Sequence, residues 1–285
     1  MEAMANRRLL AAAFLLLAGR LPAQTPEPPV KSFALNTDAG MSLDLQGRYE
    51  DARKYLDRAI KAARTDPEKA KARRTMAISY AFTADCKGAE KFSRQAFDYY
   101  LSVNDFFDAG ETANELGRIC IESGDLAKAS DWYDRGHETG LQEPDIKDAR
   151  ADVWAFRWYH AKARLAVRQG KPEEARKLVA RAKAVLDKGR IPEQQPYFPY
   201  LAGYVAFHSG DFKAALSELE GALQDDPFIL SLTGQCHEKL GDPASARRFY
   251  EKAASLQVHS VPAAFGRTYA VARLAAFLAE RIERR

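Results

Sequence analysis

Small and bulky apolar residues recur along this chain at helical spacing, in blocks that are separated by short turns. Within a block, small residues lie seven positions apart, which places them on one face of an α-helix, two turns apart. The turn residue is glycine in all blocks but one, and an aspartate often follows it. Glycine commonly ends a helix and aspartate commonly begins one. Each block therefore predicts two helices joined by a tight turn.

Six blocks align on their turn residues, and small residues recur seven positions before, five positions after and twelve positions after each turn. The turn residues are Gly47, Ala84, Gly124, Gly170, Gly210 and Gly241. A bulky residue usually lies between the two later small positions, as Leu56, Tyr133, Val179, Leu219 and Tyr250. One helix pair cannot bury its own apolar face, but stacked pairs can. The pattern predicts an all-α solenoid.

The spacing resembles the tetratricopeptide repeat (TPR) from about Phe33 to Leu256. The third copy shows it best, with Leu116-Gly117, Gly124-Asp125, Ala129, Tyr133 and Gly136. The copies depart from the family in lacking an opening Trp and in the irregular intervals between their turns. The resemblance implies a right-handed solenoid of about six TPR-like helix-turn-helix repeats, to which the sequence adds a C-terminal capping helix.

Four segments are expected along the chain: a signal peptide (1–24), a Pro-rich linker (25–32), a TPR-like repeat domain (33–260) and a C-terminal capping helix (261–285). Arg7 and Arg8 precede an apolar run, Leu9–Gly19, that is too short to span a bilayer. Signal cleavage near Gln24 predicts a periplasmic or secreted protein with no integral membrane span. Retention of this segment as an uncleaved anchor is the alternative.

Composition narrows the function classes. The formal net charge of +4 is too small to indicate a nucleic-acid-binding protein. The cysteines are Cys86, Cys120 and Cys236, which are too few for a disulfide framework and lack metal-binding spacing. Cys120 and Cys236 are expected to be buried small residues. A Cys86–Cys120 bridge is the alternative, because these residues belong to adjacent repeats.

No recognisable catalytic or cofactor-binding motif occurs. The histidines are His137, His160, His208, His237 and His259, and none forms a metal-binding pair at helical spacing. We therefore expect no cofactor, no metal and no enzymatic activity. An enzyme with a carboxylate site in the groove, using Glu115 or Glu122, is an alternative that perturbed titration would favour.

Charge is segregated along the middle of the chain. Residues 101–156 contain 13 acidic and 5 basic residues, whereas residues 157–190 contain 11 basic and 3 acidic ones. Two interpretations are open. The two stretches can attract each other across neighbouring repeats, or the basic stretch can form a patch for an acidic partner.

In the TPR family the first helix of each repeat lines the concave groove, so the resemblance implies which residues face it. A cationic row beside an aromatic row suits an extended peptide that has a carboxylate and apolar side chains. The alternative is that the tyrosines only pack between repeats. The expected peptide- or partner-binding residues are Arg157, His160, Arg164 and Arg168 in the fourth copy and Tyr197, Tyr200, Tyr204 and Phe207 in the fifth.

The sequence thus predicts an exported, non-enzymatic TPR scaffold or adaptor that binds a protein or peptide in its concave groove. The charge pattern admits an acidic partner, and no nucleic-acid partner is expected. A structural subunit of an envelope complex is the other non-enzymatic hypothesis, and sedimentation would separate it from a monomeric adaptor.

Overall fold

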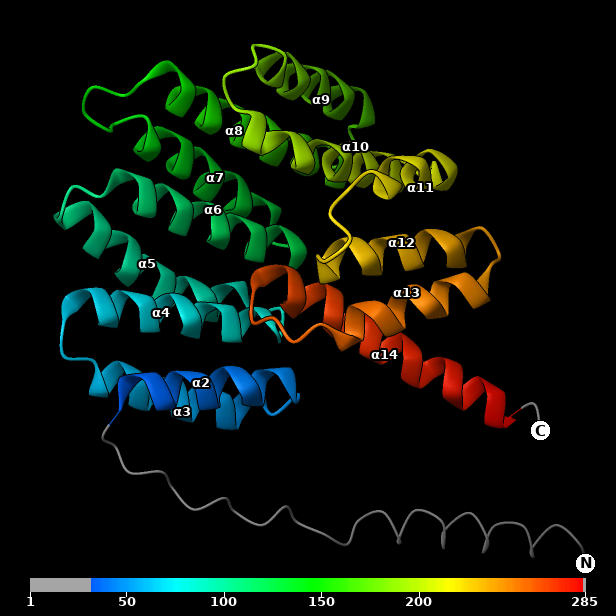
Figure 1. The fold of residues 1–285 in the computed structure, drawn as a ribbon, viewed down its shortest axis with the longest axis horizontal. Helices are drawn as coiled ribbons and strands as arrows, with labels where there is room; N and C mark the ends of the chain where they lie inside the picture. The colour runs from blue at the N-terminus through cyan, green and yellow to red at the C-terminus, as the bar shows by residue number, and fades with distance from the viewer. Residues whose placement is uncertain (1–31, 284–285) are drawn as a thin grey trace, which may run out of the picture. The chain divides into compact units, whose positions relative to one another are not determined.

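The computed structural model describes residues 32–283, which form α-helices and one short 3₁₀ helix, with no strand in this range. Six consecutive helix pairs are followed by a last long helix (Figure 1). The first three pairs are α2 (Phe33–Leu45) with α3 (Tyr49–Ala62), α4 (Asp66–Ala81) with α5 (Cys86–Ser102), and α6 (Phe106–Glu122) with α7 (Leu126–Gly140). The next three are α8 (Asp148–Arg168) with α9 (Pro172–Leu186), α10 (Phe198–His208) with α11 (Phe212–Glu220), and α12 (Pro227–Lys239) with α13 (Pro243–Ser255). The last helix is α14 (Val261–Glu283).

The two helices of each pair pack on each other, and successive pairs stack. The predicted all-α solenoid of helix-turn-helix repeats is confirmed. The expected signal peptide and nearly all of the linker lie outside the described residues. Within the described part of the chain, no helix combines the length and the apolar character needed to cross a membrane.

The turns have one backbone conformation, and this explains the aligned glycines. All six turn residues have positive φ, from 51° at Ala84 to 90° at Gly124. This left-handed conformation suits glycine and strains alanine. In four of the turns the next residue is an aspartate whose side chain accepts a hydrogen bond from the first turn of the following helix; these are Asp85, Asp125, Asp211 and Asp242.

Small residues on each first helix make room for the bulky residue of the second helix. A Cβ atom added at Gly117 would lie 2.8 Å from the ring of Tyr133. At Gly203 it would lie 2.7 Å from Leu219, and both bulky side chains are almost completely buried. Close approach of the two helices therefore requires glycine at these positions, so the predicted alternation of small and bulky residues defines the packing within a pair.

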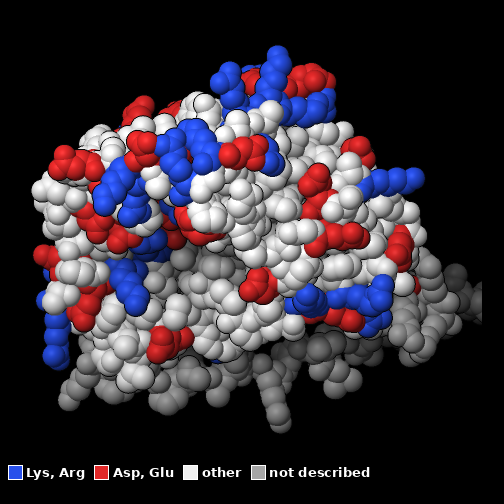
Figure 2. Space-filling model, turned by 45° about the horizontal axis from the view of Figure 1, so that its top comes forward, with Lys and Arg blue, Asp and Glu red and all other residues white. Residues whose placement is uncertain are grey.

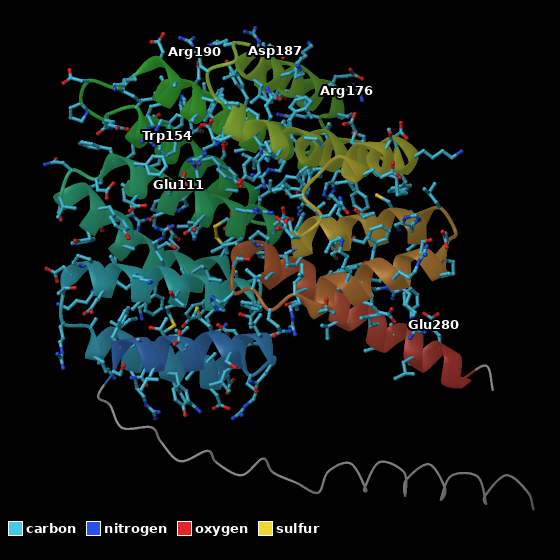
Figure 3. All side chains as sticks on the ribbon, in the orientation of Figure 1. Glu111, Trp154, Arg176, Asp187, Arg190 and Glu280 are labelled. Carbon is cyan, nitrogen blue, oxygen red and sulfur yellow. A yellow bond between two sulfur atoms is a disulfide. The ribbon has the colours of Figure 1, made fainter. Side chains whose placement is uncertain are left out.

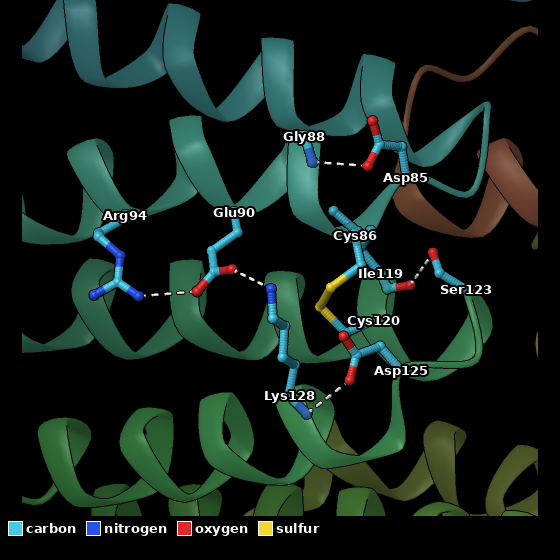
Figure 4. Close-up of a disulfide and its surroundings, with 10 residues drawn as sticks. All are labelled: Asp85, Cys86, Gly88, Glu90, Arg94, Ile119, Cys120, Ser123, Asp125 and Lys128. Carbon is cyan, nitrogen blue, oxygen red and sulfur yellow. Dashed lines mark hydrogen bonds and ion pairs between the residues drawn. A yellow bond between two sulfur atoms is a disulfide. The ribbon is translucent and has the colours of Figure 1, made fainter.

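A disulfide joins Cys86 at the start of α5 to Cys120 on α6 (Figure 4). Their Cα atoms are 4.8 Å apart. Cys120 is buried as expected, and the alternative to an unbonded cysteine, a bridge between adjacent repeats, is the one the structure shows. The cause is helix packing, which brings the second helix of one repeat against the first helix of the next. Cys236 is free and buried.

The C-terminal segment packs on two separate parts of the solenoid. Helix α14 lies along α12 and α13, and its first turns also contact α4 and α6. The Nε2 atom of His259 lies 2.9 Å from Oδ2 of Asp44, and Arg267 donates a hydrogen bond to the carbonyl oxygen of Leu45. The segment from His259 onward therefore links the last repeat to the first three.

The fifth repeat begins with a short 3₁₀ helix, η1 (Pro192–Tyr197), and α10 begins only at Phe198. Pro196 lies inside η1, whereas Pro199 lies in the first turn of α10. Because a proline interrupts the hydrogen bonds of a longer α-helix, the two prolines divide the element into two pieces.

Candidate functional site

A cavity of about 440 Å³ lies where the first helices of the middle repeats face the C-terminal segment. Helices α6, α8 and α10 contribute most of its polar wall, and His259–Pro262 closes one side. Its apolar wall includes Ile78, Phe156 and Ile229. This volume is in the range of small-molecule sites in proteins. The C-terminal segment thus converts part of the expected concave groove into a cavity.

Two arginines of this cavity, Arg118 on α6 and Arg164 on α8, are the unusual feature of its wall. Nε and Nη2 of Arg118, and Nε and Nη1 of Arg164, are buried and have no hydrogen-bond partner among the described residues. Only Nη2 of Arg164 is bonded, to the Tyr133 hydroxyl at 3.0 Å. The side chain of Arg164 is only 5% exposed. Buried cations of this kind are normally paired, because desolvating an unpaired charge is costly.

The histidine and tyrosine side chains around these arginines are neutral at neutral pH. Burial, together with Arg164 and Arg118, lowers the pKa of His160 well below its ordinary value. Burial raises the pKa of Tyr133 to about 12 and also raises that of Tyr200. The Tyr200 hydroxyl and Nε2 of His160 are buried without a hydrogen-bond partner in the described part of the chain. The wall therefore offers unused hydrogen-bonding groups beside two arginines that have no ion-pair partner among the described residues and whose guanidinium groups lie over aromatic rings.

The acidic side chains of the cavity are already engaged. Glu111 forms an ion pair with Arg157, and Glu115 pairs with Arg74 at 2.9 Å. Glu111 lies on α6 close to Trp154 of α8, whereas Arg176 and Asp187 lie out on α9 (Figure 3). Burial raises the pKa of Glu111 even though Arg157 opposes this effect. Oδ1 of Asp226 accepts hydrogen bonds from the first turn of α12.

The structure brings five of the eight predicted binding residues to this cavity: Arg157, His160, Arg164, Tyr197 and Tyr200. They differ in accessibility. Tyr197 is 45% exposed, whereas Tyr200 and Arg164 are buried. A large partner can therefore reach Tyr197 and the partly exposed Arg157 directly, but the buried members face only the interior of the cavity.

The other three predicted residues lie away from the cavity. Tyr204 is fully buried, and its hydroxyl donates to Glu122 and accepts from Arg168 at 3.0 Å. Arg168 also forms an ion pair with Glu122. Phe207 is half-buried and packs edge-on against Phe212. Tyr204 and Arg168 thus link the third, fourth and fifth repeats through Glu122, whereas Phe207 contacts Phe212 within the fifth repeat.

Five of the eleven basic side chains of residues 157–190 form ion pairs with carboxylates of residues 101–156. Residues of the basic stretch pair with residues of the acidic stretch as Arg157–Glu111, Lys162–Asp134, Arg168–Glu122, Lys188–Asp152 and Arg190–Asp148. Figure 2 shows Lys and Arg side chains gathered at the top of the view, with acidic side chains among them. This arrangement corresponds to the interpretation in which the two stretches attract each other.

The sequence prediction missed Arg118, Glu111 and Asn114, although the repeat register contained the signal. Arg118 lies six positions before its turn residue, as Arg164 does in the next repeat. Asn114, His160 and Tyr200 share a position ten before the turn, and Glu111, Arg157 and Tyr197 share one thirteen before it. Extending the predicted stripe to the third repeat would therefore have identified Arg118, Asn114 and Glu111. The segment His259–Pro262 had no such signal.

No cluster of three or more His, Cys, Asp or Glu side chains suited to a metal ion occurs within residues 32–283. Among the histidines, His259 is bonded to Asp44, His137 lies 3.2 Å from the carbonyl oxygen of Trp154, and His237 lies near Asp242. Burial lowers the pKa of His208 to about 4.

Comparisons with known proteins agree with this architecture. Family models described as tetratricopeptide repeat match residues 37–81 and 200–259, and a second one matches residues 159–181. These matches cover all helix pairs except the third, in whole or in part. No curated protein gives a significant match to the chain.

Several solved structures are similar at low sequence identity. They include PilW, a type IV pilus biogenesis factor (18% identity, TM-score 0.43, covering 77% of this chain and 90% of that one). Another is pilF of Pseudomonas aeruginosa (16% identity, TM-score 0.40, 88% and 100% covered). A third is a putative kinesin light chain of Podospora anserina with TPR-like repeats (14% identity, TM-score 0.43, 81% and 97% covered).

Proposed function

Because the chain is a tetratricopeptide repeat protein, we propose that it is a non-enzymatic scaffold that binds a protein or peptide partner in an extracytoplasmic compartment. The observation that carries the proposal is the uninterrupted series of six stacked helix pairs. Stacked repeats present a continuous surface made of many first helices, which suits recognition of another chain.

The disulfide supports the proposed extracytoplasmic location. Cys86 and Cys120 are bonded within a chain that has one further cysteine, Cys236, in a buried position. Disulfides persist in oxidising compartments and are rare in the cytosol. The basic start and short apolar run of residues 1–24 fit export to such a compartment.

The partner would contact the accessible rim of the cavity on η1 and α8. Tyr197 is 45% exposed there, and Arg157 is partly exposed beside it in the cavity wall. Exposed tyrosine and arginine side chains contribute disproportionately to protein interfaces. Unlike Arg164 and Tyr204, Tyr197 can be replaced without opening a buried network, whereas Arg157 also forms the ion pair with Glu111.

Crosslinked affinity capture of the tagged protein from its native envelope tests the proposal. We expect wild type to recover a defined partner and Tyr197→Ala to recover at least fivefold less. Arg181→Ala, an exposed position on α9, is the matched control and should leave recovery unchanged. Equal recovery by wild type and Tyr197→Ala would contradict this placement of the partner, and recovery of no partner would contradict the scaffold itself.

A structural subunit of an envelope complex is the second candidate. Its support is the apolar exposure of α14, where Tyr269, Val271 and Leu278 are 40%, 45% and 61% exposed. Sedimentation of the purified chain distinguishes the monomeric adaptor from the structural subunit. A monomer at micromolar concentration supports the adaptor, and a stable assembly that Leu278→Glu dissociates supports the subunit.

A further inference from the structure

We propose that the central cavity is a binding site for a small molecule that carries one carboxylate on an apolar body. The site is separate from the protein-binding rim of the preceding proposal. Its carboxylate would lie between Arg118 and Arg164, with the Tyr200 hydroxyl as an additional donor.

The first argument is the state of the two arginines. Four of their N–H-bearing atoms are buried and unbonded within the described chain, and both side chains line the same cavity. Arg164 is only 5% exposed, and its hydrogen bond to the Tyr133 hydroxyl holds the side chain at the cavity. A guanidinium group presents its donors in a planar fork that matches a carboxylate, so an anion bound here would satisfy both groups.

The second argument is the charge balance of the wall. The carboxylates of Glu111 and Glu115 are neutralised by Arg157 and Arg74, while Arg118 and Arg164 have no ion-pair partner among the described residues. His160 adds no charge, because burial lowers its pKa. The cavity wall therefore has two arginines without an ion-pair partner among the described residues, with the Asp226 carboxylate in the same wall. Because three carboxylates also line it, including Asp226, a monoanion fits better than a phosphate dianion.

The third argument is the rest of the wall. Phe156, Ile229 and Ile78 line the same cavity, and the ring of Phe228 lies 5.4 Å from the Arg118 guanidinium carbon. Small-molecule sites combine such apolar lining with a few convergent polar groups. The cavity volume of about 440 Å³ allows an aliphatic or aromatic body but not a folded partner. These features favour an amphiphilic carboxylic acid.

Titration calorimetry of the purified full chain tests the proposal with hexanoate and 3-phenylpropionate as probes. We expect saturable binding of both at one site per chain, at least tenfold tighter than binding of hexanol, phenylphosphate or inorganic phosphate. Arg118→Gln should weaken hexanoate binding at least tenfold. Arg150→Gln, on α8 but outside the cavity, should change it less than twofold.

Three results would overturn the proposal: no binding of either carboxylate, tighter binding of phenylphosphate, or unchanged affinity in Arg118→Gln. Arg164→Gln should weaken hexanoate binding as Arg118→Gln does. Because Arg164 is deeply buried, Arg164→Gln can fail to fold, and in that case the affinity of Arg118→Gln alone decides the question. Thermal unfolding without added probe gives an independent readout. Arg118→Met should unfold at a higher temperature than wild type, since it removes an unpaired buried charge, and a lower temperature would show that Arg118 stabilises the fold instead.

Discussion

The imidazole of His259 and the carboxylate of Asp44 lie 2.9 Å apart, although 215 residues separate them along the chain. Both side chains are almost completely buried, and Ser79 of the second repeat donates a hydrogen bond to the other oxygen of Asp44. The contact joins the first repeat, the second repeat and the segment that leads into α14. This polar contact therefore fixes the segment His259–Pro262, which forms one side of the cavity.

Removing this contact should destabilise the whole repeat domain. His259→Ala leaves the buried Asp44 carboxylate without one of its partners, which should lower the free energy of unfolding by about 2–4 kcal/mol. His237→Ala is the control, because His237 lies 3.5 Å from the half-exposed Asp242 and should cost less than about 1 kcal/mol. Urea unfolding measures both. Equal effects of the two substitutions would show that the closure does not stabilise the fold.

The Cys86–Cys120 disulfide should contribute substantially to stability. It closes a loop with a sequence separation of 34 residues. The loop-entropy relation gives about 3–4 kcal/mol for a loop of this length. We expect the Cys86→Ser, Cys120→Ser double variant to unfold at lower urea concentration by that amount, and dithiothreitol to lower the stability of wild type but not of the variant. Cys236→Ser provides the reference for an unbonded cysteine. Identical unfolding of wild type with and without dithiothreitol would contradict the bond.

The turn at Ala84 should be improved by glycine. Ala84 has φ of 51° at a position where the other five repeats have glycine with positive φ. Ala84→Gly should therefore raise the free energy of unfolding by about 0.5–1 kcal/mol, the relief of left-handed strain less the greater freedom of glycine in the unfolded chain. Gly124→Ala should have the opposite effect. Chemical denaturation measures the free energy of unfolding of both variants. A loss of stability in Ala84→Gly would show that the left-handed conformation of Ala84 is not strained.

The small residues on the second helices should not tolerate enlargement. Ala129 and Ala215 are both 0% exposed. Ala129→Leu or Ala215→Leu should lower the free energy of unfolding by about 1–3 kcal/mol through overpacking. Leu141→Ala, at an exposed site, serves as a neutral comparison. Unchanged thermal unfolding in both leucine variants would show that the repeat register is wrong.

Acidification should destabilise the domain through His208. Its pKa is lowered from 6.5 to about 4, mainly by burial and also by Arg168, and its ring packs 4.4 Å from that of Tyr204. In this case the unfolded state binds the proton more readily, so stability is constant above pH 6.5 and falls as the pH drops toward 4. The loss attributable to His208 should reach about 2 kcal/mol at pH 5. His208→Gln should show a smaller loss between pH 7.5 and pH 5 than wild type; an identical loss would exclude His208 as the cause.

The repeat architecture was predictable because its signals are local. The spacing of Gly117, Ala129 and Tyr133 specifies a helix, a turn and a second helix, and the same local rule recurs in each copy. The mutual packing of the small and bulky positions then follows from helix geometry alone. For the same reason the adjacent repeats could be expected to bring Cys86 near Cys120.

The cavity was only partly predictable. Periodicity identified the stripe that contains Arg157, His160 and Arg164, but it could not show that neighbouring helices bury Arg164 and Tyr204. Whether a stripe is open or covered depends on contacts between distant segments. The closure by His259 is of this kind, since nothing in the sequence near His259 indicates its contact with Asp44.

The central claim is that the accessible rim beside the cavity binds another protein, and site-specific photo-crosslinking in the native cell tests it most directly. A photoreactive phenylalanine at Tyr197 should give one discrete crosslinked product, and the same residue at Arg181 on α9 should give none. A product at both positions with the same pattern, or at neither, would contradict the claim.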